Sequence, residues 1–339
     1  MSCLPVPDLS VNVTHWNDTE ALDAYREAVH AGITQFKSMY GRAPLVLNVG
    51  AQAGLLALFA LRAGAQHVVV VDANIEALSL AQRTLQTEQH TQFTLINKHS
   101  LQFSWPCKFD VVIADMFGPS LNDKGIAFYM HDLLQRQLVQ RYDNKHFVIP
   151  AEGIMSVRLY DVPEASLDQR AVYKHLTLYT EPTEPGPTVV KWQSGPGAFY
   201  QPWSQWKALT PHVEVLHESY DREPIQSWPS HITLDPRDKI NRAVLVQEWS
   251  IALSPTVTLR NVVTSPYVRR HAWGLLWCWL DATRASTWCV SVKNNGGVTL
   301  TAAPALAGTA STVVTRPPGK ITSLVQNTFA KVALMQEPA

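Results

Sequence analysis

Residues 46–54 read VLNVGAQAG, and this stretch decides the fold class of the chain. An apolar strand runs into a glycine turn, and an apolar helix follows directly. Turns of this kind that bind a nucleotide usually read D-x-G-x-G-x-G, because the glycines let the backbone approach the ligand. Gly50 and Gly54 keep the outer glycines, whereas Asn48 replaces the acid and Gln52 replaces the middle glycine. The stretch predicts either a nucleotide-type turn with altered chemistry or a bare connection between strand and helix.

The sequence around this turn, residues 18–150, alternates between helix-like and strand-like stretches. Helical spacing of apolar residues marks 20–36, 55–64 and 75–86, and strand-like runs occupy 45–49, 67–72, 93–100 and 109–117. This alternation predicts a doubly wound parallel sheet, a Rossmann-like domain. Asp72 ends the second strand, where an acid can hydrogen-bond ribose hydroxyls. Its spacing from Gly50, Gly54 and Gly64 favours descent from an S-adenosylmethionine site.

The pattern changes after Pro150. Alternating apolar residues in 153–162, 242–253, 271–282 and 297–306 predict antiparallel strands, and NNGG at 294–297 predicts a turn. We therefore expect a short N-terminal segment (1–17), a Rossmann-like domain (18–150) and a β-sandwich or β-barrel domain (151–339).

Composition narrows the function classes. Lys plus Arg and Asp plus Glu number 28 each, so the net charge is zero and a nucleic-acid-binding surface is not expected. The chain has neither a signal-like N-terminus nor an apolar run long enough for a membrane span. Its four cysteines form no CxxC pair and its histidines show no metal-ligand spacing. These features predict a cytoplasmic or nuclear protein without a metal site.

Four stretches carry a resemblance to a known family. They are VLNVGAQAGLLALFALRAGAQHVVVVDAN, LINKHS, FDVVIADMFGPSLNDKG and FVIPAEGIMSVRLYDVPE, which together lie within residues 20–165. This part of the chain resembles the protein arginine methyltransferases. The resemblance implies a Rossmann-like methyltransferase domain that binds S-adenosylmethionine, an antiparallel β-barrel domain and a dimerisation arm that projects from the barrel.

The residues that the family uses for chemistry are altered in this sequence. Two family glutamates hold the substrate guanidinium, because paired carboxylates orient a planar cation. The first matches Asp115 and the second matches Lys124, a cation that repels the substrate; Asp123 could replace it only if the hairpin shifted register. The family's Thr-His-Trp loop matches best at residues 327–329, where Asn327, Thr328 and Phe329 take the three positions, so Thr328 replaces the histidine.

The family's N-terminal lid over the cofactor also has no counterpart. The first 17 residues contain neither the tyrosines nor the arginine that the lid uses. The turn positions Asn48, Gly50, Gln52, Gly54 and Asp72 are therefore interpreted as a degenerate cofactor site. We expect no bound cofactor and no working catalytic residue.

Residues 180–207 are the predicted dimerisation arm. The segment is rich in proline and glycine, yet it carries the aromatic residues Trp192, Phe199, Tyr200, Trp203 and Trp206. Aromatic residues on such a segment are typical of a protein interface. The alternative is a long loop that folds its aromatic residues back onto the barrel.

Three functions follow from these observations. The first is a catalytically inactive arginine methyltransferase homologue that acts as the regulatory, activating subunit of an active one. The second is an active methyltransferase with a different substrate, which would bind S-adenosylmethionine through Gly50, Gly54 and Asp72. The third is a methyltransferase-fold scaffold for other proteins.

Overall fold

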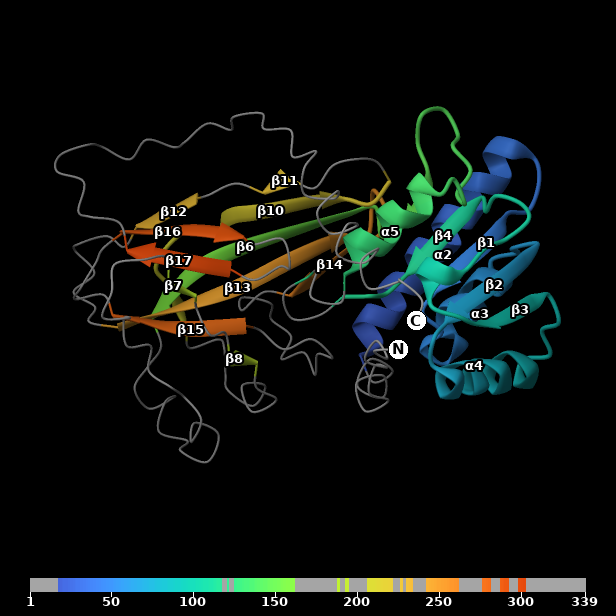
Figure 1. Cartoon of the computed structure of the whole chain (residues 1–339), viewed down its shortest axis with the longest axis horizontal. Coiled ribbons are helices and arrows are strands. Elements are labelled where there is room, and N and C mark those ends of the chain that lie inside the picture. Colours follow the sequence, from blue (N-terminus) through green and yellow to red (C-terminus); the bar gives the residue numbers. More distant parts are fainter. Residues whose placement is uncertain are drawn as a thin grey trace, which may run out of the picture.

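The computed structural model describes residues 18–117, 121, 125–161, 188–189, 193–194, 206–221, 226–227, 230–233, 242–261, 276–281, 287–292 and 298–302. An α/β part and an antiparallel β part lie next to each other along the long axis of the molecule (Figure 1). The two parts follow one another in the sequence, and the change from one sheet to the next falls between Ile149 and Glu152.

The α/β part is built on a five-stranded parallel sheet in the order β3-β2-β1-β4-β5. Its strands are β1 (Leu45–Val49), β2 (His67–Asp72), β3 (Phe93–Asn97), β4 (Val111–Ala114) and β5 (Phe147–Ile149). The helices are α2 (Thr19–Tyr40), α3 (Leu55–Arg62), α4 (Ile75–Thr87) and α5 (Ile126–Gln135), with 3-10 turns η1 (Gln52–Gly54) and η2 (Ser100–Gln102). The doubly wound, Rossmann-like architecture is thereby confirmed.

Helix α2 has well-defined ends that explain its length. The Asp18 carboxylate accepts a hydrogen bond from the Ala21 N–H at 3.0 Å, which satisfies one of the free donors at the helix start. Gly41 ends the helix with φ of 66°, a backbone conformation that favours glycine. Between these caps, buried Tyr25, Ile33 and Phe36 lie on one face. The helix is therefore longer than the predicted 20–36.

The strand order identifies the edge of the sheet at which a ligand would bind. β1 lies between β2 and β4, so the direction in which the sheet grows reverses at β1. In open α/β sheets, ligands bind beyond the carboxyl ends of the strands at such a point. The turn after Val49, the end of β2 at Asp72 and the chain from Asp115 onward meet at this edge.

The antiparallel part forms a curled half-barrel. One sheet has eight strands: six follow the order β11-β10-β6-β13-β15-β8, β9 pairs with β6, and β14 pairs with β13. The other sheet has the order β12-β16-β17-β7. The strands are β6 (Glu152–Asp161), β7 (Thr188–Val189), β8 (Gln193–Ser194), β9 (Lys207–Ala208), β10 (Val213–Ser219), β11 (Gln226–Ser227), β12 (Ser230–Thr233), β13 (Arg242–Ala252), β14 (Thr258–Asn261), β15 (Leu276–Asp281), β16 (Thr287–Val292) and β17 (Val298–Ala302). The predicted antiparallel β domain is confirmed.

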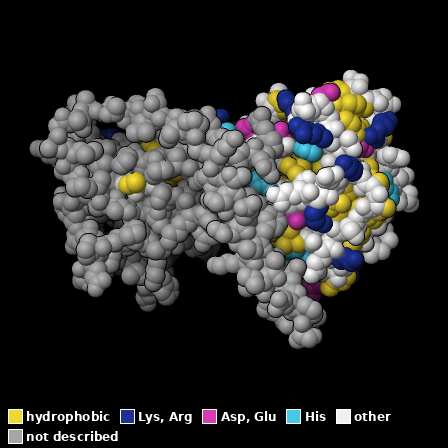
Figure 2. Space-filling view, turned by 45° about the horizontal axis from the view of Figure 1, so that its top comes forward, with side chains coloured by type: hydrophobic (Ala, Val, Ile, Leu, Met, Phe, Trp, Pro, Cys, Tyr) yellow, Lys and Arg dark blue, Asp and Glu magenta, His cyan; other side chains and the backbone are white. Residues whose placement is uncertain are grey.

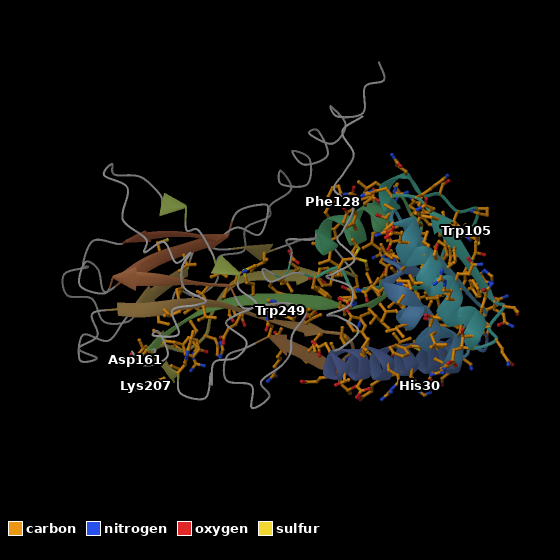
Figure 3. All side chains as sticks on the ribbon, turned by 90° about the horizontal axis from the view of Figure 1, so that it is seen from below. His30, Trp105, Phe128, Asp161, Lys207 and Trp249 are labelled. Carbon is orange, nitrogen blue, oxygen red and sulfur yellow. The ribbon has the colours of Figure 1, made fainter. Side chains whose placement is uncertain are left out.

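An aromatic cluster joins the two parts. The ring of Phe117, which follows β4, lies 6.3 Å from the ring of Tyr220 and 6.2 Å from that of Trp249. Trp249 is labelled on β13 in Figure 3, and all three rings are buried. A Cβ atom on Gly153 would lie 2.4 Å from the Tyr220 hydroxyl, so glycine is required for this packing.

Two predicted strands are shorter in the structure. β3 ends at Asn97 instead of residue 100, and β4 covers only Val111–Ala114 of the predicted 109–117. The Asn97 amide donates to the Asp72 and Ala73 carbonyls at 3.1 and 3.0 Å, and His99 Nδ1 accepts from the Leu101 N–H. These side-chain contacts turn the chain into η2, and apolar pattern alone does not reveal them.

Candidate functional site

The backbone of the turn after β1 is tightly wound. Gly50, Gln52, Ala53 and Gly54 have φ angles of 86°, 39°, 55° and 81°, all in the left-handed region. A Cβ atom on Gly54 would lie 3.0 Å from the backbone of Ala81, so α4 approaches the turn closely at this glycine. The two retained glycines therefore have structural reasons to be glycine, whether or not a ligand binds.

Gln52 lies in the turn after β1, and its side chain reaches the residue that follows β4. Its Nε2 donates to the main-chain carbonyl of Asp115 at 2.6 Å. A φ of 39° costs a non-glycine residue on the order of 1–2 kcal/mol. The side chain thus spans the place where the fold would hold a cofactor, at a conformational cost that glycine would avoid.

Asn48 is completely buried at the end of β1. Its Nδ2 donates to the carbonyls of Gly50 at 3.0 Å and Ile113 at 3.4 Å. Its Oδ1 has no hydrogen-bond partner within the described part of the chain. Because both neighbouring groups accept hydrogen bonds, the site suits an amide and does not suit the carboxylate of the usual motif.

Asp72 lies at the end of β2, as the sequence predicts, and its carboxylate binds the protein's own backbone. Oδ2 accepts from the Ala51 N–H at 2.7 Å, and Oδ1 accepts from the Asn74 N–H at 2.8 Å. Asn74 in turn caps α4 through its side chain. Asp72 therefore organises the turn and the helix start. Each carboxylate oxygen keeps further acceptor capacity toward a ligand hydroxyl.

Asp115, the first predicted catalytic position, is buried directly after β4. Tyr25 of α2 lies beside it and donates its hydroxyl to the Ala114 carbonyl at 3.1 Å. Burial, together with the nearby Asp115 charge, raises the pKa of Tyr25 well above its ordinary value. Lys124, Asp123 and Thr328 lie outside the described residues.

A second buried carboxyl near this site was not predicted from the sequence. Glu218 of β10 is fully buried, and Tyr220 donates its hydroxyl to Glu218 Oε2 at 2.9 Å, whereas Oε1 has no hydrogen-bond partner among the described residues. Burial raises the pKa of the Glu218 carboxyl to about 8. The only sequence signal is alternation: Glu218 falls between Leu216 and Tyr220 on the buried face of the strand.

The predicted arm, 180–207, is described in part. The chain leaves β6 at Asp161, and Lys207 of β9 pairs with Asp161 in an antiparallel arrangement. Within the predicted arm, β7 pairs with β17 and β8 pairs with β15, which places these short stretches on the half-barrel. Trp206 packs on Tyr160 of the same chain at a ring distance of 6.0 Å. The remaining predicted interface residues, Trp192, Phe199, Tyr200 and Trp203, lie outside the described part.

Other site classes receive no support from the described residues. Within the described ranges, no three His, Cys, Asp or Glu side chains lie together as a metal site would require. No helix in that part of the chain is long and apolar enough to cross a membrane. Figure 2 shows basic side chains in separate groups on the α/β part of this face, with acidic, histidine and apolar side chains among them.

Comparisons with known proteins agree with this architecture. The family model "Methyltransferase small domain" matches residues 33–116. The fold is similar to that in the Trypanosoma brucei PRMT1 enzyme-prozyme heterotetrameric complex with AdoHcy, with a TM-score of 0.57 and 17% identity, over 81% of this chain and 85% of that chain. It is also similar to an open conformation of Arabidopsis thaliana protein arginine methyltransferase 10, with a TM-score of 0.56 and 13% identity, over 79% and 81% of the two chains. No curated protein matches the sequence. The chain therefore has a fold like that of the arginine methyltransferases.

Proposed function

We propose that this chain is a non-catalytic subunit that pairs with an active protein arginine methyltransferase and activates it. The observation that carries the proposal lies at the cofactor edge of the sheet. There the side chain of Gln52, in the turn after β1, reaches the end of β4, and Asp72 accepts hydrogen bonds from the backbone of the turn and of Asn74, the residue that caps α4. These side chains are hydrogen-bonded to the protein's own backbone, which fits a turn stabilised without a ligand better than it fits a site for S-adenosylmethionine. We therefore expect no bound cofactor.

The predicted substrate position supports the same conclusion. Orienting a guanidinium requires two carboxylates that can reach it together. Asp115 is only 8% exposed and lies against Tyr25, and the second position in the sequence is Lys124. A lysine in place of the second carboxylate removes the partner of the substrate cation and adds repulsion.

The preserved fold supports a role as a partner. The fold similarity covers 85% of the matched chain of the trypanosome structure, a complex that combines an enzyme and a prozyme. A subunit can activate an enzyme only if it binds the enzyme's active state more tightly than its inactive state. We propose that this chain does so as part of a hetero-oligomer in the cytoplasm or nucleus.

Co-expression with an active arginine methyltransferase homologue from the same organism tests the proposal. The expected result is a stable hetero-oligomer whose methylation rate exceeds that of the homologue alone. The control is this chain alone, which should show no methylation of an arginine-containing peptide. Absence of a complex with any such homologue would contradict the proposal and favour the scaffold function.

A second candidate is an active methyltransferase with a different substrate. The position of Asp72 at the end of β2, with acceptor capacity left on both oxygens, favours it. Methylation by the isolated chain, measured with labelled S-adenosylmethionine and a mixture of cellular proteins, would support this candidate.

A further inference from the structure

Three successive main-chain carbonyls at the end of β4 each accept a hydrogen bond from a side chain. Asn48 Nδ2 donates to Ile113 O at 3.4 Å, Tyr25 Oη donates to Ala114 O at 3.1 Å, and Gln52 Nε2 donates to Asp115 O at 2.6 Å. The donors come from β1, from α2 and from the turn after β1. We call these three donors the β4 clasp.

Two members of the β4 clasp are the residues that depart from the nucleotide-binding motif. An ionised aspartate at position 48 could not donate to Ile113 O, and glycine at position 52 has no side chain. Both departures therefore introduce donors aimed at the same strand end. Random loss of a cofactor site would not be expected to produce this convergence.

We propose that the β4 clasp replaces a ligand in holding the end of β4 against the turn after β1. In an open α/β sheet, a cofactor bound at this edge would bridge the two strand ends. Here the chain's own side chains form the bridge, so the edge stays ordered without a cofactor. The inference rests on the proposed function, because a subunit that activates a partner must present one constant shape.

The backbone conformation of Gln52 allows a test of the inference, because the direction in which Gln52→Gly changes the melting temperature depends on the clasp. Gln52 has φ of 39°, so glycine would relieve strain there. If the side chain contributes nothing, Gln52→Gly should raise the melting temperature. If the clasp holds the edge together, loss of the Gln52 hydrogen bond outweighs the relief of strain and the melting temperature falls.

Gln89 provides a matched control. It is also a glutamine at positive φ, 58°, but it is exposed and lies beyond the end of α4. We expect Gln52→Gly to lower the melting temperature by about 2 °C or more and Gln89→Gly to raise it by about 2 °C. A rise with Gln52→Gly equal to that with Gln89→Gly would overturn the inference.

Two further variants, in which glutamate replaces a glutamine of nearly the same shape, test the inference if Gln52→Gly does not fold. Gln52→Glu preserves shape and backbone but cannot donate at neutral pH, whereas the exposed Gln89 side chain makes no hydrogen bond within the described part of the chain. Hydrogen exchange at residues 111–117 should be at least tenfold faster in Gln52→Glu than in the wild type and unchanged in Gln89→Glu. Equal exchange in all three proteins would overturn the inference. Activation of a partner by the wild-type chain is measured separately. A negative result for the β4 clasp can therefore be distinguished from a negative result for the proposed function.

Discussion

At the scale of single residues, buried polar groups decide how this chain responds to pH and to substitution. Glu218 and Asn48 are fully buried, and each has one oxygen without a hydrogen-bond partner within the described structure. Asp110, in contrast, is almost completely buried but has several donors. These three environments give predictions of different sign.

The Glu218 carboxyl makes the chain less stable as pH rises. Burial raises its pKa from 4.5 to about 8, so the folded protein retains a proton that the unfolded chain releases. The contribution to stability is complete below pH 4.5, falls by about 1.4 kcal/mol per pH unit above that, and is lost above about pH 8. Glu218→Gln should remove this slope, as measured by urea unfolding from pH 5 to 9. The exposed Glu27→Gln variant is the control, and an unchanged slope in Glu218→Gln would contradict the assignment.

Restoring the usual acid at position 48 should destabilise this protein. Asn48→Asp would place a carboxylate against the Gly50 and Ile113 carbonyls in a fully buried site. We expect a loss of about 3 kcal/mol in the free energy of unfolding at pH 7, partly recovered near pH 4 where the acid protonates. Denaturant unfolding checks this, with the exposed Asn144→Asp as the matched variant. Equal stability of Asn48→Asp and the wild type would show that the site tolerates the charge.

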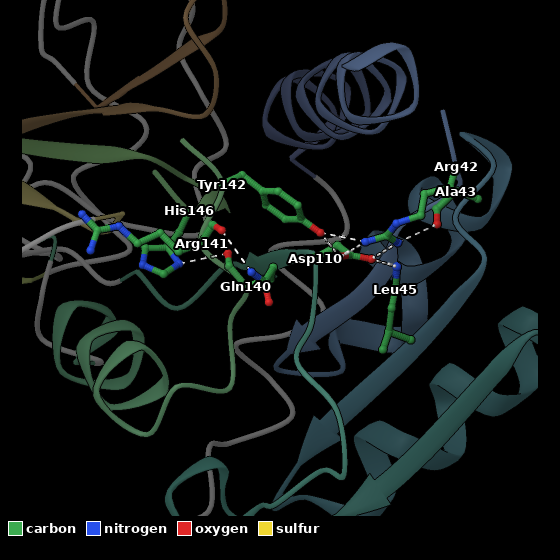
Figure 4. A network of polar contacts seen from close by, with 8 residues as sticks. All are labelled: Arg42, Ala43, Leu45, Asp110, Gln140, Arg141, Tyr142 and His146. Atoms are coloured by element: carbon green, nitrogen blue, oxygen red, sulfur yellow. Dashed lines mark hydrogen bonds and ion pairs between the residues drawn. The ribbon is translucent and has the colours of Figure 1, made fainter. Parts of the chain in front are cut away.

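At the scale of elements, one network ties together the strands at the edge opposite the candidate site. Arg42, just after α2, donates to both oxygens of Asp110 at 2.7 and 2.6 Å, and the Leu45 N–H at the start of β1 donates at 2.8 Å (Figure 4). The Tyr142 hydroxyl donates to the same carboxylate. A single side chain before β4 thus fixes the starts of two strands and the end of a helix.

The Asp110 network should make the chain sensitive to acid. Burial alone would raise the pKa of Asp110, but the hydrogen bonds from Arg42, Tyr142 and Leu45 outweigh it and leave the pKa below its ordinary value. This stability is present above the pKa of the unfolded chain and is lost as pH falls through the folded value. Asp110→Asn should cost about 1–2 kcal/mol at pH 7 and less than that below pH 4. Unfolding followed at both pH values checks this, and a larger loss in acid would contradict it.

The elements also show how far the sequence could predict this structure. Long periodic stretches such as α2 and the apolar run of β2 were predicted because burial imposes their spacing. The position of Asp72 at the cofactor edge was predicted because it ends β2. The contact from Gln52 to Asp115 joins residues 63 apart in the chain, and no local pattern encodes it. The buried position of Glu218 was not predicted because alternation with Leu216 and Tyr220 is its only signal, and an acid on an apolar face is usually assigned to the surface.

At the scale of the whole molecule, the fold is similar to the two-part architecture of the arginine methyltransferases, and the Gln52 side chain joins the turn after β1 to the end of β4. Phe117, which follows β4, packs with Tyr220 and Trp249 and joins the two parts. The proposed role as a non-catalytic partner rests on this combination of a similar fold and an altered turn.

The first measurement is a calorimetric titration of S-adenosylmethionine into the purified chain. We expect no binding with a dissociation constant below roughly 100 μM, which corresponds to about −5.5 kcal/mol. An active arginine methyltransferase titrated under the same conditions is the positive control. Binding by this chain below that concentration would contradict the claim that the cofactor edge is closed, and would bring the active methyltransferase back as the better account.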